Sequence, residues 1–182
     1  MARSFGTVHA FEPQRAIYQM LCGNLALNGY SNVVTHNIAL YDRNGSVRLA
    51  PQERQETDVA IKNGQPNYAR ITNAAALSFD FISDGSVDGD VRTISLDHMA
   101  LENVRLIKID TQGADLRVLQ GAVDTIRRCR PIILFEWERD LDLQHGTALD
   151  DFFSFFADLS YDVVLLHDTT PGRQADYIAK PR

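Results

Sequence analysis

The sequence VRLIKIDTQG, residues 104–113, decides the fold. Its apolar-rich run from Val104 to Ile109 is typical of a strand that is buried in a parallel sheet. The run stops at Asp110, and Gly113 permits a tight turn into the next segment. That segment carries apolar residues at helical spacing, namely Leu116, Leu119, Val123 and Ile126. The stretch therefore predicts a strand followed by a helix, the repeating unit of α/β proteins.

The same alternation continues on both sides of this stretch. We predict further strands at residues 7–11, 32–38, 91–96, 132–135, 161–166 and 177–179, and further helices after Pro13 and at 149–159. Asn44–Gly45 indicates a hairpin-like excursion. The last two strands are joined by a short turn, which predicts an antiparallel C-terminal edge. The fold class expected is α/β, with a doubly wound, mainly parallel sheet that has helices on both faces.

The bulk properties limit the protein to a few classes. With 182 residues, 45% of them hydrophobic, the chain is long enough for one domain with its own core. Within residues 1–182 we interpret 51–90, which are polar and turn-rich, as a variable insertion. The net charge of −6 argues against a broad nucleic-acid surface. The lack of a long apolar run argues against a membrane span, and two distant cysteines favour a reduced, cytoplasmic protein.

Polar side chains follow the predicted strands where ligands bind in open α/β sheets. They are Glu12, Asn37, Asp110 and Glu136. Glu12 could accept hydrogen bonds from ribose hydroxyls, or it could be an acid at a helix N-terminus. Asp110 could serve a ligand or cap a helix. Glu136 could take a proton from a substrate hydroxyl or be a solvated loop acid.

Other well-known site motifs are missing from the chain. The sequence contains no GxGxxG, no phosphate-binding GxxxxGK[ST], no HExxH and no GxSxG. Its five histidines show no metal-ligand spacing, so we expect no metal site. A dehydrogenase with a nucleotide-binding fold stays open as an alternative, but the absent glycine-rich turn disfavours it.

Five segments, taken in order, resemble the FkbM family of methyltransferases. They are VHAFEP (8–13), NIAL (37–40), TISLD (93–97), IKIDTQGAD (107–115) and RPIILFE (130–136). VLQG at 118–121 completes the family's pattern around the fourth of them. Each segment is a weak signal by itself, but the ordered set spans nearly the whole chain.

The resemblance implies a class I methyltransferase fold, Rossmann-like, that uses S-adenosylmethionine to methylate a hydroxyl of a small molecule or sugar. It implies that Glu12 binds the cofactor ribose and that Asn37 and Ala39 lie near the adenine. Asp110 would lie near the methionine part of the cofactor and the transferred methyl. Glu136 would face the substrate, so Asp110 and Glu136 are the expected catalytic residues.

Two departures from the family pattern bear on activity. Gln112 and Asp115 stand where the family has glutamates. The family also has a strand and a D-x-G-A-N-x-G-like turn just before the segment at 8–13, so we expect the chain to be N-terminally truncated relative to the family. Two central strands would then have unpaired edges, which gives the protein a reason to dimerise. A catalytically inactive binding or interaction domain is the alternative function.

Overall fold

The computed structural model describes residues 6–51, 61–62, 65–66, 77–81 and 91–182. Most of the predicted insertion at 51–90 lies outside these residues. The chain divides into two compact units. The first comprises residues 1–40 and 45–93, and the second comprises 41–44 and 94–182. Each unit is described by itself.

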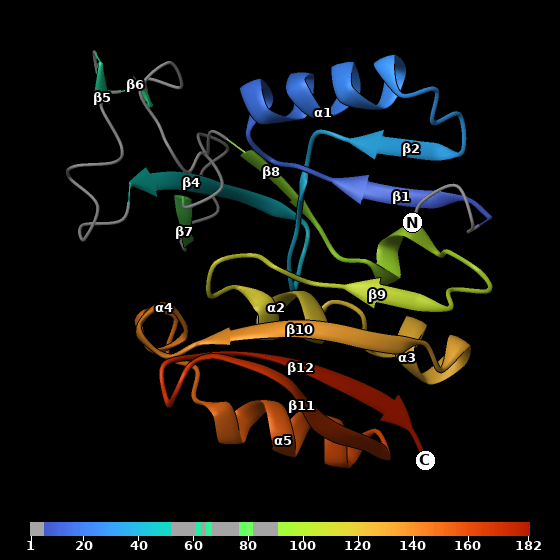
Figure 1. Ribbon diagram of the computed structural model, residues 1–182, viewed down its shortest axis with the longest axis vertical. Coiled ribbons are helices and arrows are strands. Elements are labelled where there is room, and N and C mark those ends of the chain that lie inside the picture. The colour runs from blue at the N-terminus through green and yellow to red at the C-terminus, as the bar shows by residue number, and fades with distance from the viewer. Residues whose placement is uncertain (1–5, 52–60, 63–64, 67–76, 82–90) are drawn as a thin grey trace. The chain divides into compact units, whose positions relative to one another are not determined.

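The first unit begins with a strand–helix–strand motif (Figure 1). Strand β1 (Val8–Phe11) runs parallel to β2 (Val33–His36), and helix α1 (Arg15–Leu27) connects them. The Tyr18 hydroxyl of α1 lies 3.1 Å from the Thr35 hydroxyl of β2, which holds the helix on the strand pair. Gly29 follows the helix with φ +66°, a conformation that glycine adopts at little cost. The first two predicted strands and their helix are confirmed.

A second sheet of the first unit has the order β3-β8-β4-β7. Its strands are β3 (Ala39–Leu40), β4 (Gly45–Pro51), β7 (Leu77–Phe81) and β8 (Val91–Ile94), and a separate pair joins β5 (Ile61–Lys62) to β6 (Gln65–Pro66). Strand β4 is antiparallel to both β7 and β8. The predicted hairpin at Asn44–Gly45 is wrong, because β8 lies between β3 and β4. Asn44 instead accepts a 3.1 Å hydrogen bond from the Ser95 amide, which ties it to the segment after β8.

The second unit contains a four-stranded sheet of order β11-β12-β10-β9. Its strands are β9 (Leu106–Lys108), β10 (Ile132–Glu138), β11 (Tyr161–Thr170) and β12 (Gln174–Pro181). Strands β9 and β10 are parallel, whereas β12 is antiparallel to both β10 and β11. The predicted antiparallel C-terminal edge is therefore present. The predicted mainly parallel sheet is not confirmed, since among the described strands the parallel pairings assigned are β1–β2 and β9–β10.

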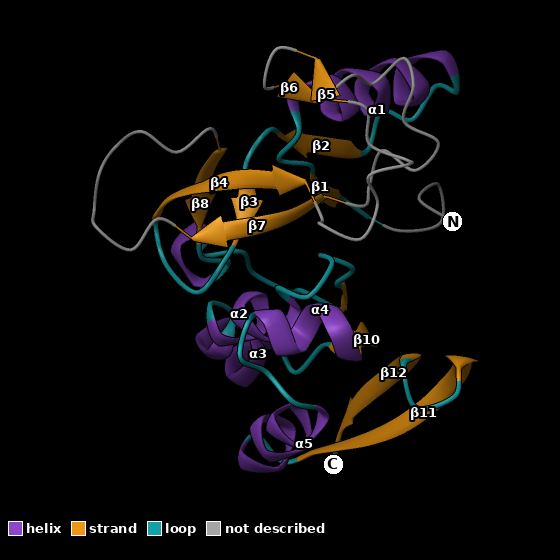
Figure 2. Ribbon diagram, turned by 90° about the vertical axis from the view of Figure 1, so that its left-hand side faces the viewer, coloured by secondary structure: helices purple, strands orange, loops and turns teal. Residues whose placement is uncertain are grey.

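Helices α2 (Asp115–Gln120), α3 (Val123–Cys129) and α5 (Leu149–Asp158) lie on the same face of this sheet (Figure 2). Both crossovers, β9 to β10 and β10 to β11, move in one direction across the sheet, and right-handed connections then place their helices on one side. The core lies beneath them, where the Phe135 ring stacks on Phe152 with centroids 5.0 Å apart. The other face is more open: Ile132 is 41% exposed. In this unit the helices thus cover one face, not both.

One predicted helix is divided in two. The apolar spacing from Leu116 to Ile126 predicts a single helix, but α2 ends at Gln120 and α3 begins at Val123. Gly121 lies in the break, where an added Cβ would overlap the carbonyl oxygen of Tyr41. Glycine allows this close backbone approach. A short 3-10 helix, η3 (Asp97–Met99), lies next to the break, with the Asp97 amide donating to the Gly121 carbonyl at 2.9 Å.

The last two helices, α4 and α5, lie between β10 and β11 in the chain. Helix α4 (Arg139–Gln144) follows β10 directly, and α5 begins after a turn at Gly146. The Asp151 carboxylate accepts a 2.7 Å hydrogen bond from the Ala148 amide and so caps α5. No helix in the described part of the chain is long and apolar enough to cross a membrane.

Candidate functional site

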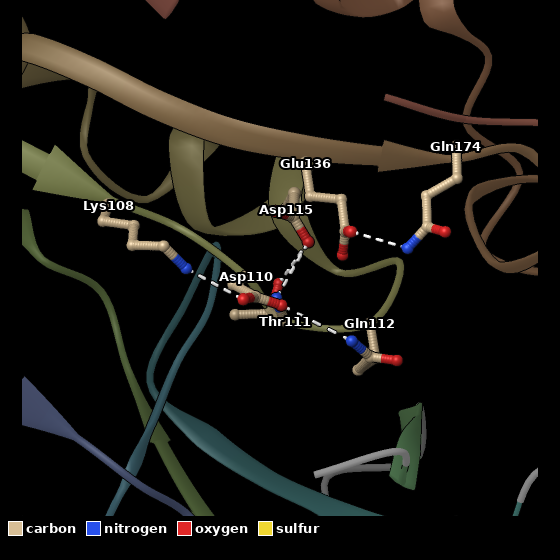
Figure 3. A network of polar contacts seen from close by, with 7 residues as sticks. All are labelled: Lys108, Asp110, Thr111, Gln112, Asp115, Glu136 and Gln174. Carbon is tan, nitrogen blue, oxygen red and sulfur yellow. Dashed lines mark hydrogen bonds and ion pairs between the residues drawn. The ribbon is translucent and has the colours of Figure 1, made fainter. Parts of the chain in front are cut away.

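The first site residue of the second unit is Asp110, two residues after β9. The amide of Ile109 donates to the Leu134 carbonyl of β10 at 2.8 Å, which fixes the end of the strand. The Asp110 side chain is 48% exposed and lies 2.8 Å from the Lys108 ammonium group. The Gln112 amide contacts its other oxygen at 3.4 Å (Figure 3). A glutamate at position 112 would repel Asp110, so Gln112 gives this chain a neutral donor in its place.

The loop after Asp110 has an unusual backbone. Gln112 has φ +55° and Gly113 has φ +94°, both in the left-handed region. A Cβ at Gly113 would lie 2.8 Å from the carbonyl carbon of Leu141, a buried residue of α4. The loop therefore lies directly against α4, and position 113 is restricted to glycine by both conformation and space.

Glu136 lies in β10, the neighbour of β9. The sequence predicts that the strand stops at Glu136, but β10 continues to Glu138, so Glu136 is held by the sheet rather than by a loop. Its carboxylate accepts a 2.7 Å hydrogen bond from Gln174 of β12. Burial raises the pKa of Glu136, the Gln174 bond lowers it, and the nearby charges of Asp110 and Asp176 raise it again. Asp110 and Glu136 thus belong to one electrostatic cluster.

Two buried aspartates lie behind these residues. Asp115 is 2% exposed and Asp142 is 1% exposed. Burial raises the pKa of Asp115 to about 7, and hydrogen bonds from Thr111 oppose that shift. Burial also raises the pKa of Asp142 to about 8, against a hydrogen bond from the Glu138 amide. The family pattern marks Asp115 as an acidic position, whereas nothing in the sequence singles out Asp142 or Gln174.

The remaining predicted residues lie in the first unit. The Glu12 carboxylate accepts a 2.7 Å hydrogen bond from the Gln14 amide at the start of α1, which is the helix N-terminal role considered for it. Burial raises the pKa of Glu12, and that hydrogen bond lowers it. The Asn37 side chain donates to the Glu12 carbonyl at 2.9 Å, and Ala39 is buried in β3. The structure thus brings Glu12 and Asn37 together.

The five predicted residues fall into two groups, one in each unit. Glu12, Asn37 and Ala39 belong to the first, whereas Asp110 and Glu136 belong to the second. Within the described ranges, no group of three or more His, Cys, Asp or Glu side chains could hold a metal ion.

Comparison with known proteins identifies related sequences and folds. The family described as Methyltransferase FkbM domain matches residues 3–163. A crystal structure of methyltransferase FkbM from Methylobacillus flagellatus KT is similar to this chain, with a TM-score of 0.53 and 17% sequence identity. The similarity covers 96% of this chain and 36% of that protein, so the chain spans about a third of its length. A search of curated proteins returns no match.

Proposed function

The chain belongs to the FkbM methyltransferase family, and from that premise we propose that it transfers a methyl group from S-adenosylmethionine to a hydroxyl of a small molecule or sugar. One observation carries the proposal. Asp110 follows β9, and Glu136 lies near the carboxyl end of its parallel neighbour β10, on the side where ligands bind in such sheets. Lys108 contacts the Asp110 carboxylate, and Gln174 contacts the Glu136 carboxylate. The charge of Asp110 also raises the pKa of Glu136.

The chemistry of these side chains fits the cofactor. S-adenosylmethionine carries a cationic sulfonium, an ammonium group and a ribose diol, all of which carboxylates bind well. Asp110, which is half exposed, would hold the cationic methionine part. Glu12 would accept from the ribose and Asn37 would lie near the adenine. When bound, the cofactor supplies an electrophilic methyl group.

Methyl transfer to a hydroxyl requires a base that accepts the hydroxyl proton. Glu136 would take this proton, because burial raises its pKa above that of an ordinary glutamate. Gln174 holds the carboxylate in one orientation through the 2.7 Å hydrogen bond. A modest base is sufficient because the methyl group is already strongly activated, so most of the catalytic effect would come from positioning the reactants.

A second function, a catalytically inactive binding or interaction domain, has one specific observation in its favour. The Glu12 carboxylate is already engaged by the Gln14 amide, so part of its capacity to accept from ribose hydroxyls is used. The two functions differ in whether cofactor binding and turnover occur.

Calorimetric titration of the whole chain with S-adenosylmethionine, and with its demethylated product, tests both. The proposal expects binding of both nucleosides, weakened by about tenfold or more in Asp110→Asn, since a charge-assisted contact is lost. Asp124→Asn, an exposed aspartate of α3 in the same unit, is the matched control. Absence of binding by the folded wild-type chain would contradict the enzyme proposal and favour the inactive domain.

A further inference from the structure

Asp115, the first residue of α2, makes an unusual pair of contacts. Its Oδ2 atom accepts hydrogen bonds from the Thr111 amide at 3.1 Å and from the Thr111 hydroxyl at 2.7 Å (Figure 3). Its other oxygen, Oδ1, is buried and has no hydrogen-bond partner within the described ranges. Burying a carboxyl group costs free energy when one of its oxygens has no hydrogen-bond partner. Capping of α2 alone does not account for an aspartate at this position.

Thr111 lies at the centre of the site loop. It separates Asp110 from Gln112, the two residues whose side chains meet at 3.4 Å. The loop cannot rely on its own backbone, because Gln112 adopts φ +55°, which costs a non-glycine residue about 1 kcal/mol. The contacts of Thr111 with Asp115 oppose that cost and hold the loop in this conformation.

We propose that Asp115 is a positioning residue, which acts through Thr111 to hold the loop that carries Asp110 and Gln112. The inference deepens the proposed function, since it concerns the residues that would bind the methionine part of the cofactor. Asp115 itself lies behind the loop and is 2% exposed, so it would support ligand binding without touching the ligand.

Asp115 can perform this role as a neutral acid. Both contacts with Thr111 are accepted by the carboxyl group, and a protonated carboxyl still accepts through one oxygen. The charged groups that face it, Asp110 after β9 and Glu136 of β10, add to burial in raising its pKa to about 7. Asp142 of α4 is also electrostatically coupled to it. The proton would sit on Oδ1, the oxygen without a partner.

This neutral role predicts that asparagine can replace Asp115. Asp115→Asn keeps an oxygen that accepts from Thr111, whereas Asp115→Ala removes it. Thr111→Val removes the hydroxyl contact and leaves the backbone contact, so its effect should be intermediate. Asp124→Ala, an exposed first-turn aspartate of α3, serves as the control for loss of a helix N-terminal charge.

Amide hydrogen exchange at Thr111, followed by NMR, tests the loop without any ligand. Loss of the amide's acceptor in Asp115→Ala should lower protection by about tenfold, in line with the free energy of one hydrogen bond. Asp115→Asn and Asp124→Ala should stay near the wild-type value. Unchanged protection in Asp115→Ala, or an equal loss in Asp115→Asn, would overturn the inference. If Asp115→Ala does not fold, the comparison of Thr111→Val with Thr111→Ser decides, because serine retains the hydroxyl.

Titration of the same variants with S-adenosylmethionine tests the functional part. Affinity should fall about tenfold in Asp115→Ala, matching its loss of loop protection, and recover in Asp115→Asn. Loss of affinity in Asp115→Asn as severe as in Asp115→Ala would reject the positioning role. If the wild type does not bind the cofactor while the exchange results hold, the proposed function fails and the loop-holding role of Asp115 stands.

Discussion

Gln174 of β12 donates a 2.7 Å hydrogen bond to Glu136 of β10, a residue 38 positions earlier in the chain. The antiparallel register that pairs Glu136 with Asp176 brings this amide beside the carboxylate. The bond favours the charged form of Glu136 and so works against burial, which raises the pKa of that group. The relation gives a direct test of Glu136 as the base.

Gln174→Met should raise the pKa of Glu136 further, since it removes the donor that stabilises the carboxylate. A base is active when it is deprotonated, so the rate of methyl transfer falls on acidification. In the variant this fall should occur at a higher pH than in the wild type. The pH–rate profile measures this, and NMR titration of the Glu136 carboxyl measures it without turnover. Gln120→Met on α2 is the control. An acid limb that stays in place or moves downward would exclude Glu136 as the base.

Asp142→Asn should flatten the dependence of stability on pH. The pKa of Asp142 is raised from 3.8 to about 8, so its stabilising contribution is fully present below about pH 4 and is lost as pH rises through 8. Asparagine keeps an acceptor for the Glu138 amide and has no proton to lose. In urea unfolding from pH 5 to 9, the free energy of unfolding of the variant should therefore rise relative to that of the wild type as pH rises. Parallel profiles, like those expected for exposed Asp150→Asn, would refute the assignment.

Gly113→Ala should destabilise the protein more than Gly146→Ala. Both glycines have positive φ, +94° and +70°, so both substitutions introduce backbone strain. An added Cβ meets Leu141 at position 113, whereas nothing lies within 4 Å at position 146. We expect about 1 kcal/mol at position 146 and about 2–4 kcal/mol at position 113, where overpacking adds to strain. Thermal unfolding measures the loss of stability in both variants. Equal losses would show that α4 shifts to make room for the added methyl group.

Asp97→Ala should loosen the start of α3. The Asp97 carboxylate accepts hydrogen bonds from the Thr125 amide at 2.7 Å and the Asp124 amide at 3.0 Å, capping that helix from outside it. Loss of both contacts should cost about 1–2 kcal/mol in free energy of unfolding. Asp97→Asn, which retains one acceptor oxygen, should lose about half as much. Chemical denaturation provides the measurement, and a neutral alanine variant would contradict the capping role.

Much of the local structure could be predicted from residues close together in the chain. The apolar run before Asp110 predicted β9, and the position of Pro13 predicted the start of α1. The placement of Asp110 after one strand, and of Glu136 near the end of another, followed from the same alternation. The pairing of β8 with β4 could not be predicted, because it depends on contacts between segments far apart in sequence. The close approach of the Tyr41 carbonyl to Gly121, in the break between α2 and α3, likewise joins segments far apart in the chain.

By itself the sequence determined the β1–α1–β2 motif, the acids near the strand ends and membership of the family, because each of these is carried by local spacing and ordered motifs. Tertiary structure decided which of those acids are exposed and which are buried. Asp110 and Asp115 are five residues apart and chemically identical, yet one is half exposed beside Lys108 and the other is 2% exposed beneath the loop. Burial and the neighbouring charges of Asp110 and Glu136 raise the pKa of Asp115. That environment comes from β10 and from α4, whose residue Leu141 packs against the loop at Gly113, so distant parts of the chain set the role of Asp115.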